Sequence, residues 1–468
     1  MAGTAVTELI EVPLVALSEL IRSGEVSPVD IAASALRRLE QWEPHLHAFA
    51  TVTAELCVDA ARVAEAEILA GDWRGPLHGI PVGVKDLFDT AGVPTEAGSA
   101  VRAGNIPRHD AAAVARLRAA GMPILGKTTT HEFAHGGTTP GTANPWDLGR
   151  IPGGSSGGSG AAVGAGIVHV ALGTDTAGSV RIPAALCGTV GLKPTYGRVS
   201  RFGLTPLSWS LDHIGVLTRS VADAALLLAA LAGADPRDPT TDTVGATGFE
   251  FAAFGEVRGL RVGVPASSFG TCDPEVEAAV LAAASELQGS GAELIEIAVP
   301  EPELIGIVEW TLLTAEASAY QSKTMRRRPD LFGDDVRMLN EAGEAILATD
   351  YINALRLRTH VRATFAALFR EVDVLLLPTV STTATTREDP FVRWPDGTVE
   401  GASDAYTRFC ILANVTGLPA LQLPVGRSTS GLPLGVQLLG RPCEEQALFT
   451  AGTVLENAFP WSAPPVPG

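Results

Sequence analysis

Residues 153–191 are dense in glycine, serine and alanine, and they constrain the fold of this chain more than any other segment. A glycine-rich run can be a flexible linker, but the flanking residues here are small and apolar, which favours tight packing. Ser155 and Ser156 stand where a helix of small residues, expected over 161–167, would begin. Backbone N–H groups point outward at such a helix start, and the dipole end is positive. We therefore expect a packed part of the core.

A second cluster of small residues, 173–178, leads directly into Ser179. Small side chains there allow successive backbone N–H groups to converge on one point, as an oxyanion hole requires. Asp175 and Arg181 flank this serine and are candidates to brace the turn. Further upstream, Lys85 ends an apolar run, where burial would lower the pKa of its side chain and let the amine act as a base.

Lysine is rare in this chain. Only four of the 34 basic residues are lysine, at Lys85, Lys127, Lys193 and Lys323. Arginine cannot give up its proton near neutral pH, whereas a desolvated lysine can. A retained lysine therefore indicates a task that arginine cannot perform, with chance retention as the alternative.

Short apolar runs alternate with stretches of helical apolar spacing along most of the chain. Strands are expected at 80–84, 123–125, 260–264, 293–298, 374–377, 421–424 and 434–439, and helices at 31–39, 54–69, 111–120, 221–231, 274–287, 302–369 and 444–455. This alternation predicts an α/β fold with a sheet covered by helices on both faces. Length alone suggests about three domains. Residues 236–242 are the best linker candidate, but no tract resembles a flexible tether, so we expect one domain.

Composition argues against several classes of protein. With 34 Lys+Arg and 52 Asp+Glu, the formal charge is −18, so a basic face that binds nucleic acid is not expected. Mean hydropathy is +0.22, which argues against intrinsic disorder. A membrane span needs roughly 18 apolar residues in a row. The best candidates, 160–173 and 221–234, are interrupted by His169 and Asp223.

The five cysteines are scattered and form no CxxC pair, which indicates neither a disulfide framework nor a thiolate metal site. Residues 1–12 lack a basic stretch before an apolar run, so no signal peptide is expected. The expected location is a reducing cytoplasm.

Three short motifs lack the context that their chemistry needs. Residues 121–128 match the phosphate-loop pattern, but the residues inside it form an expected strand and include Pro123, which has no N–H. Residues 131–135 match HExxH, but the following glycines leave room for barely one helical turn. Residues 153–157 match the GxSxG elbow, but a loop precedes them where a strand is required. No metal or cofactor is expected.

At the two glycine/serine clusters and Lys85, the chain resembles the amidase signature family. The family's first block matches 153–159, its second matches 175–198, and its strand-end lysine matches Lys85. Residues 127–128, 144–146, 211–215 and 416–419 also fit. The resemblance implies a single α/β domain over 1–468 with a central mixed sheet. Within it, we expect N-terminal helices (1–70), a signature core (75–235), a variable pocket region (240–405) and a C-terminal return to the sheet (406–468).

The resemblance also implies a role for each site residue. Ser179 would be the nucleophile, Lys85 the base, and Ser155, in a cis peptide after Gly154, the relay between them. The oxyanion hole would consist of the N–H groups of Thr176, Ala177, Gly178 and Ser179, where Ala177 replaces a commoner glycine. The expected supporting residues are Ser156, Asp175 and Arg181. The substrate pocket would draw on Phe133, Ala134 and His135, the helices of 300–360 and a polar loop, 381–403, with Trp310, Phe332, Tyr351 and Trp394 as wall candidates.

The implied activity is hydrolysis of an amide through an acyl-enzyme. The aromatic wall candidates lead us to expect a preference for apolar or aryl amides. Carbamates and esters remain open as substrates of the same triad. A further alternative is the glutamine-hydrolysing component of a tRNA-dependent amidotransferase, which acts in a complex; a non-catalytic scaffold is the remaining one. The expected partner is a small-molecule amide or carbamate, not nucleic acid or a membrane, and a homodimer is an open alternative to a monomer.

Overall fold

The computed structural model describes residues 9, 12–244, 255–265, 271–460 and 463–464. Its strands are β1 Phe49–Val52, β2 Val82–Lys85, β3 Ile124–Thr128, β4 Val170–Asp175, β5 Val190–Lys193, β6 His213–Thr218, β7 Arg261–Pro265, β8 Glu293–Ile297, β9 Val374–Pro378, β10 Phe391–Arg393, β11 Val399–Gly401, β12 Ala420–Arg427 and β13 Pro433–Gly440. Its α-helices are α1 Leu14–Arg22, α2 Pro28–Leu46, α3 Ala54–Ala70, α4 Ala112–Ala119, α5 Gly157–Gly164, α6 Arg181–Cys187, α7 Val221–Leu231, α8 Pro274–Gly289, α9 Pro302–Met325, α10 Asp334–Glu344, α11 Ala348–Leu368, α12 Ala402–Thr407, α13 Ile411–Thr416 and α14 Glu445–Ala458.

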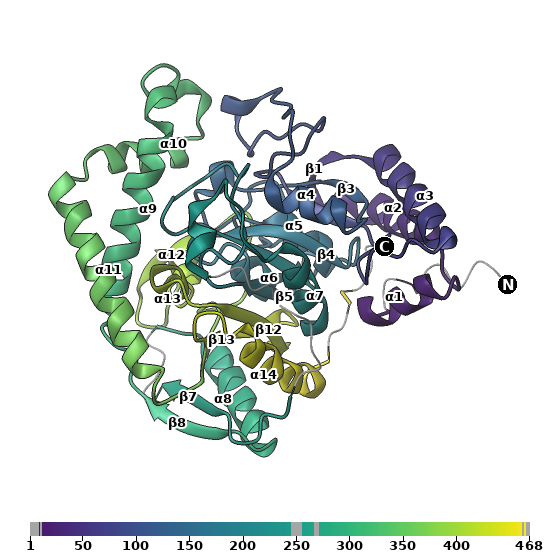
Figure 1. Cartoon of the computed structure of the whole chain (residues 1–468). Helices are drawn as coiled ribbons and strands as arrows, with labels where there is room; N and C mark the ends of the chain where they lie inside the picture. Colours follow the sequence, from purple (N-terminus) through teal and green to yellow (C-terminus); the bar gives the residue numbers. More distant parts are fainter. Residues whose placement is uncertain (1–8, 10–11, 245–254, 266–270, 461–462, 465–468) are drawn as a thin grey trace.

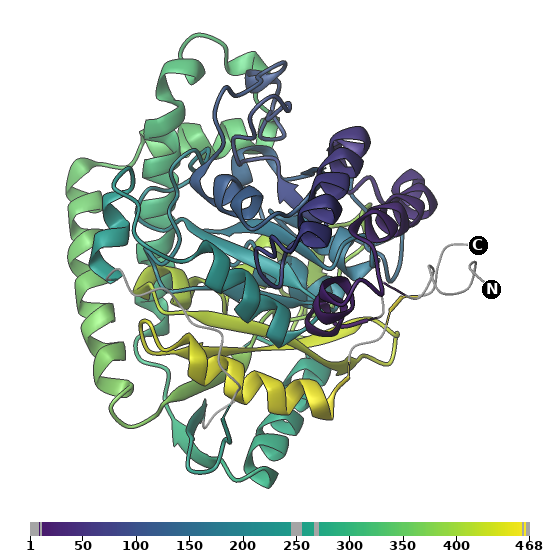
Figure 2. The same cartoon turned by 45° about the vertical axis from the view of Figure 1, so that its right-hand side comes forward.

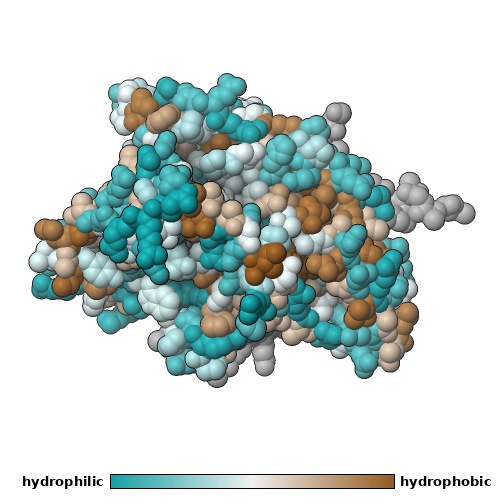
Figure 3. Space-filling model, turned by 90° about the horizontal axis from the view of Figure 1, so that it is seen from above, coloured by the Kyte–Doolittle hydropathy of each residue, from teal (hydrophilic) through white to brown (hydrophobic). Residues whose placement is uncertain are grey.

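A mixed sheet of 11 strands forms the centre, in the order β1-β3-β2-β4-β6-β5-β12-β13-β9-β7-β8. Helices cover both faces, with α2 and α3 toward one end of the molecule and α9, α10 and α11 at the other (Figures 1 and 2). The prediction of a single α/β domain with a mixed, doubly covered sheet is therefore confirmed. On the face shown in Figure 3, hydrophobic residues occur in small groups between hydrophilic ones.

The sheet is buried on both faces, as strand β4 illustrates. Val170 and Leu172 pack into the apolar cluster that includes α7, α8 and α14, whereas Ala171 packs into the cluster around α2 and α5. A small residue on the second face lets α5 approach the sheet closely. Since every β4 residue is buried, the strand shows no polar alternation, and the periodicity of the sequence does not predict it.

The pairing of β2 with β4 positions the candidate site. The two strands are parallel, with Val82 opposite Val170 and Val84 opposite Leu172. Their carboxyl ends therefore meet at the same edge of the sheet, which brings Lys85 close to Thr174 and Asp175. Figure 1 shows α5 and α6 next to this part of the sheet.

The small-residue helix begins earlier than expected. We predicted it over 161–167, but α5 spans Gly157–Gly164, so both ends lie earlier in the chain. Glycines are poor helix formers, and here they are needed for close packing. A Cβ on Gly158 would lie 2.3 Å from the Thr129 hydroxyl and 2.4 Å from the Ala48 carbonyl oxygen, so only glycine fits at this approach.

Two other expectations need correction. The loop over 381–403 is not continuous, because β10 and β11 form a two-stranded hairpin within it. The linker candidate 236–242 packs onto the domain, since Asp238 and Thr241 are buried and the Thr241 hydroxyl accepts the Asp235 N–H at 2.9 Å. Most of residues 1–12, where no signal peptide was expected, lie outside the described residues. In the described part of the chain, no helix is long and apolar enough to cross a bilayer.

Candidate active site

The amine of Lys85 lies at the centre of a buried group of hydroxyls. Its Nζ atom is 2.8 Å from each of Ser155 Oγ, Ser156 Oγ and Thr174 Oγ1. The side chain has no solvent exposure. Burial lowers the pKa of Lys85 well below its usual value, although the carboxylates of Asp175 and Asp212 oppose that shift. The uncharged amine is therefore the favoured form, and an uncharged amine can accept a proton.

Ser155 is fixed through its backbone. The peptide bond between Gly154 and Ser155 is cis. The Ser155 carbonyl oxygen accepts a hydrogen bond from the His131 N–H at 3.1 Å. The Thr139 hydroxyl donates to the Gly153 carbonyl oxygen at 3.0 Å and lies 3.3 Å from the Ser155 carbonyl oxygen. A Cβ on Gly154 would lie 2.1 Å from the Thr138 carbonyl oxygen, so glycine is required next to this serine.

Ser179 lies beside the same loop. Its carbonyl oxygen accepts the Ser156 N–H at 3.2 Å, and the residue is 5% exposed. Its hydroxyl makes no hydrogen bond to another described residue, so the link from Ser155 to Ser179 is not closed in this structure. The structure thus joins Lys85 to Ser155 directly and places Ser179 one backbone hydrogen bond from Ser156.

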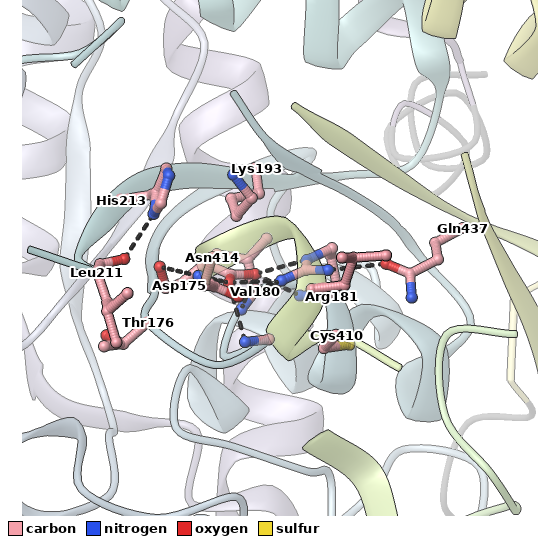
Figure 4. Close-up of polar contacts among 12 residues, drawn as sticks. Asp175, Thr176, Val180, Arg181, Lys193, Leu211, His213, Cys410, Asn414 and Gln437 are labelled. Carbon is pink, nitrogen blue, oxygen red and sulfur yellow. Dashed lines mark hydrogen bonds and ion pairs between the residues drawn. The ribbon is translucent and has the colours of Figure 1, made fainter. Parts of the chain in front are cut away.

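The Asp175 carboxylate organises the turn that carries Ser179. Its Oδ1 accepts the Gly178 N–H at 2.9 Å and the Arg181 Nη2 at 2.9 Å, and its Oδ2 accepts the Arg181 Nε at 3.0 Å. Asn414 donates to Oδ1 at 2.8 Å and to the Asp175 carbonyl at 2.9 Å (Figure 4). Burial alone would raise the pKa of Asp175, but the Arg181 guanidinium outweighs it and holds the pKa well below its usual range.

Two amide side chains complete the hydrogen bonding of the buried Asp175–Arg181 ion pair. Arg181 donates to Asn414 Oδ1 and to Gln437 Oε1, both at 2.7 Å. Gln437 in turn donates to the carbonyl oxygens of Pro378 and Phe409. Because each buried polar group has a partner, the pair avoids the cost of an uncompensated charge and acts as a rigid brace.

This brace divides the N–H groups of the turn into two sets. Gly178 and Val180 direct their N–H groups to the Asp175 carboxylate. The N–H groups of Thr176, Ala177 and Ser179 have no partner among the described residues. Of the four expected oxyanion donors, Gly178 is therefore already engaged. Ala177 does not have a positive φ, so its extra methyl group is compatible with the turn.

The expected pocket residues lie in a strained turn next to the site. Phe133 and Ala134 have φ values of 49° and 62°, left-handed conformations that are unusual for residues other than glycine. Both belong to an apolar cluster with Phe332, against which Ala177 packs. Burial lowers the pKa of His135 to about 4, so its ring is uncharged near neutral pH.

The other wall candidates are dispersed. Trp310 is half exposed. Trp394 follows β10 in the hairpin and packs with Val392 and Ala405. Tyr351 donates its hydroxyl to Glu316 at 2.8 Å. The polar loop does line a cavity of about 710 Å³ through residues 386–388 and Pro390, together with residues 138–142.

Sequence reasoning missed Thr174, Asn414 and Gln437. Thr174 adjoins Asp175 at the end of β4, and recognising that strand would have indicated it. The two amide residues lie more than 230 positions from Arg181. Nothing in the local sequence links them to it.

Three of the four lysines in this arginine-rich chain are buried. Lys85, Lys127 and Lys193 are fully buried, whereas Lys323 is exposed. Lys127, inside the phosphate-loop look-alike, lies in β3 and donates to the Phe88 carbonyl oxygen at 2.8 Å and to the Thr95 hydroxyl at 2.6 Å. The segment with the HExxH spacing forms only a short 3-10 helix, Glu132–Ala134.

Comparison with known proteins gives a consistent result. A family model described as Amidase matches residues 30–449. An amidase of Pseudomonas putida is 45% identical over 457 residues, covering 97% of each chain, and a glutamyl-tRNA(Gln) amidotransferase subunit of Roseiflexus castenholzii is 40% identical over 489 residues with the same coverage. A crystal structure of an amidase superposes with a TM-score of 0.87 at 35% identity, covering 96% of this chain and 100% of that chain.

Proposed function

This chain belongs to the amidase family of amide-bond hydrolases, and we propose that it works through a serine acyl-enzyme, with Ser179 as nucleophile, Ser155 as relay and Lys85 as base. The observation that carries this proposal is the contact of the fully buried Lys85 amine with the Ser155 hydroxyl at 2.8 Å. A buried amine without a carboxylate in contact favours its uncharged form, and only that form accepts a proton.

The hydrogen-bond inventory of Lys85 supports its role as base. An uncharged amine has two N–H groups and one lone pair, and three hydroxyls surround it. The Ser156 hydroxyl donates to the Thr174 carbonyl oxygen at 3.2 Å, so it accepts from the amine. If Thr174 accepts the second N–H, the lone pair is left for the Ser155 hydroxyl. Ser156 and Thr174 would thus orient the base toward the relay.

The proposed reaction then proceeds in two stages. Lys85 takes the proton of Ser155 while Ser155 takes that of Ser179, whose oxygen attacks the amide carbonyl carbon. The relay returns this proton to the nitrogen of the leaving amine as the C–N bond breaks, because an unprotonated amine leaves poorly. Water, activated by the same relay, then releases the carboxylic acid and restores Ser179.

The oxyanion would be stabilised by the N–H groups of Thr176, Ala177 and Ser179. Preorganised backbone donors of this kind supply a large part of the catalytic effect in acyl transfer. Asp175 and Arg181 would hold these donors in place, because the Asp175 carboxylate accepts the N–H groups of Gly178 and Val180, which flank Ser179.

We propose that the substrate is an apolar or aryl amide. The apolar cluster that Ala177 contacts contains Phe133, Ala134 and Phe332, and the nearby His135 ring is uncharged near neutral pH. Carbamates and esters with similar acyl groups would react through the same acyl-enzyme. Glutamine is the second candidate, since amidotransferase components are 38–40% identical over 95% or more of this chain.

A kinetic panel tests the substrate class. We expect the ratio kcat/KM to be highest for anilides and apolar aliphatic amides, lower for carbamates and esters, and lowest for glutamine. Release of ammonia from glutamine as the fastest reaction would instead support a role within an amidotransferase complex.

A further inference from the structure

We propose that His131 is a positioning residue, an imidazolium that carries both ring protons and joins the Ser155 loop to the start of α10. The proposal rests on the role proposed above for Ser155. It assigns a task to the segment with the HExxH spacing, which the amidase mechanism does not use.

The first part of the argument is the contact with Ser155. The His131 N–H donates to the Ser155 carbonyl oxygen at 3.1 Å. The hydroxyl of Thr139, eight residues later, donates to the Gly153 carbonyl oxygen at 3.0 Å and lies 3.3 Å from that of Ser155. Residues 131–139 therefore hold the segment 153–155 from both ends of one loop. The His131 ring closes that loop, since its Nδ1 lies 2.8 Å from the Thr138 carbonyl oxygen.

The second part is the protonation state. A carbonyl oxygen only accepts hydrogen bonds, so Nδ1 carries a proton; the Thr138 hydroxyl, at 3.4 Å, is the longer contact. The other ring nitrogen, Nε2, lies 3.0 Å from Asp335 Oδ2. An ionised carboxylate oxygen also only accepts hydrogen bonds. Both nitrogens are donors, and the ring is charged.

The third part of the argument is the set of further contacts between this loop and the start of α10. The neighbouring Gly333 N–H, at the start of α10, donates to Glu132 Oε2 at 2.8 Å, and the Phe133 and Phe332 rings are 5.8 Å apart. Three consecutive residues of the loop thus contact the start of α10. These contacts hold Phe133 and Ala134 in left-handed conformations, which are stable only when neighbouring structure enforces them.

The charged groups around His131 fit a cation. Asp335 faces it from α10, and Glu132 is adjacent in its own loop, where it also accepts the Ser99 hydroxyl. The third titratable neighbour is His135, and after burial the charge of His131 is the next cause that lowers its pKa. The His131 ring therefore contacts one carboxylate, with a second on the adjacent residue and an uncharged histidine nearby.

The protonation state is tested by nuclear magnetic resonance of the full chain labelled with ¹⁵N-histidine. The chain has nine histidines, and the signal lost in His131→Gln identifies this one. Since both ring nitrogens face acceptors, we expect both to carry protons in the native protein. In Asp335→Asn, the Nε2 signal should shift, because its carboxylate acceptor is gone. A native spectrum of a neutral imidazole would overturn the proposal without bearing on the amidase mechanism.

The positioning role is tested by steady-state kinetics of Asp335→Asn and the native protein at the same pH. We expect kcat to fall about tenfold and KM to change little, because loss of the carboxylate weakens the contacts that hold the Ser155 loop. A native kcat, or an effect confined to KM, would overturn the positioning role.

Asp334→Asn is the matched control. Asp334 precedes Asp335 in the first turn of α10, but it pairs with the exposed Arg337 at 2.9 Å and is itself exposed. This variant should match the native protein in both experiments. An equal loss of kcat in Asp334→Asn would show that α10 responds to any lost charge and would contradict a specific role for His131.

Discussion

The Nζ atom of Lys85 and the Oγ atom of Ser155 lie 2.8 Å apart although 70 positions separate the two residues in the chain. One stands at the end of β2 and the other just before α5, and α5 packs against β2 and β4, which brings the two side chains together. The contact is completely buried, which couples the chemistry of the amine to the packing of the glycine-rich segment.

Ser179→Ala should abolish turnover without unfolding the protein. The hydroxyl makes no hydrogen bond to a described residue, so its removal should leave Tm nearly unchanged, while kcat falls by about a thousandfold or more. Steady-state kinetics and thermal unfolding of the same preparation measure both effects. A variant that keeps a tenth of the native kcat would exclude Ser179 as the nucleophile.

Lys85→Arg should lose nearly as much activity as Ser179→Ala, because a guanidinium keeps its proton at any accessible pH. Lys323→Arg is the matched control, since Lys323 is exposed and should tolerate the change. The measurement is kcat/KM for both variants at several pH values. Native activity in Lys85→Arg would remove the lysine from the proton relay.

Lys85 should make folding less favourable at neutral pH. Its pKa is lowered on folding, so the native state binds fewer protons than the unfolded state, and its contribution to stability rises with pH toward 10.5. Lys85→Met removes this dependence. The free energy of unfolding of Lys85→Met minus that of the native protein should therefore decrease as pH rises from about 7 to about 10.

Denaturant titrations at several pH values measure that difference. A difference that does not change with pH would mean that the amine keeps its proton in the folded protein, in conflict with its proposed role as base.

Asn414→Ala should reduce both stability and kcat. The side chain donates to Asp175 and accepts from Arg181, so its loss leaves buried charged groups short of partners, at a cost of about 1–3 kcal/mol. We expect kcat to fall more than KM rises, because the Asp175 carboxylate, which holds the turn around Ser179, loses its contact with Asn414. Asn105→Ala, which removes a hydrogen bond to the Thr95 carbonyl oxygen, should lower stability without this kinetic effect.

If Asn414→Ala and Asn105→Ala lose the same fraction of kcat at comparable stability, the buried amide has no special link to the turn that carries Ser179.

Much of the fold follows from local patterns in the sequence. The spacing of apolar residues predicts α7 at the bounds that the structure shows, and Ser27 followed by Pro28 predicts the start of α2. The strands β4, β5 and β6 are different. They are buried on both faces, so their side chains do not alternate, and they lie in segments whose glycines do not favour strands.

The candidate site also contains residues that the sequence indicates and residues that it does not. Lys85, Ser155 and Ser179 stand out because rare or small residue types cluster in short segments. Asn414 and Gln437 carry no such signal. The role of an isolated amide becomes clear only when its buried partner, far away in the chain, is known. His131 was visible within a metal-binding spacing, but its contact with Asp335 depends on α10, which begins about 200 positions later.

Labelling with a fluorophosphonate, which captures an activated serine, tests the proposed relay most directly. The account predicts a single adduct, located by mass spectrometry on the peptide that contains Ser179. It also predicts that Lys85→Arg, with its fold intact, reacts far more slowly. An adduct on a different residue, or labelling of Ser179 at the native rate in Lys85→Arg, would contradict the account.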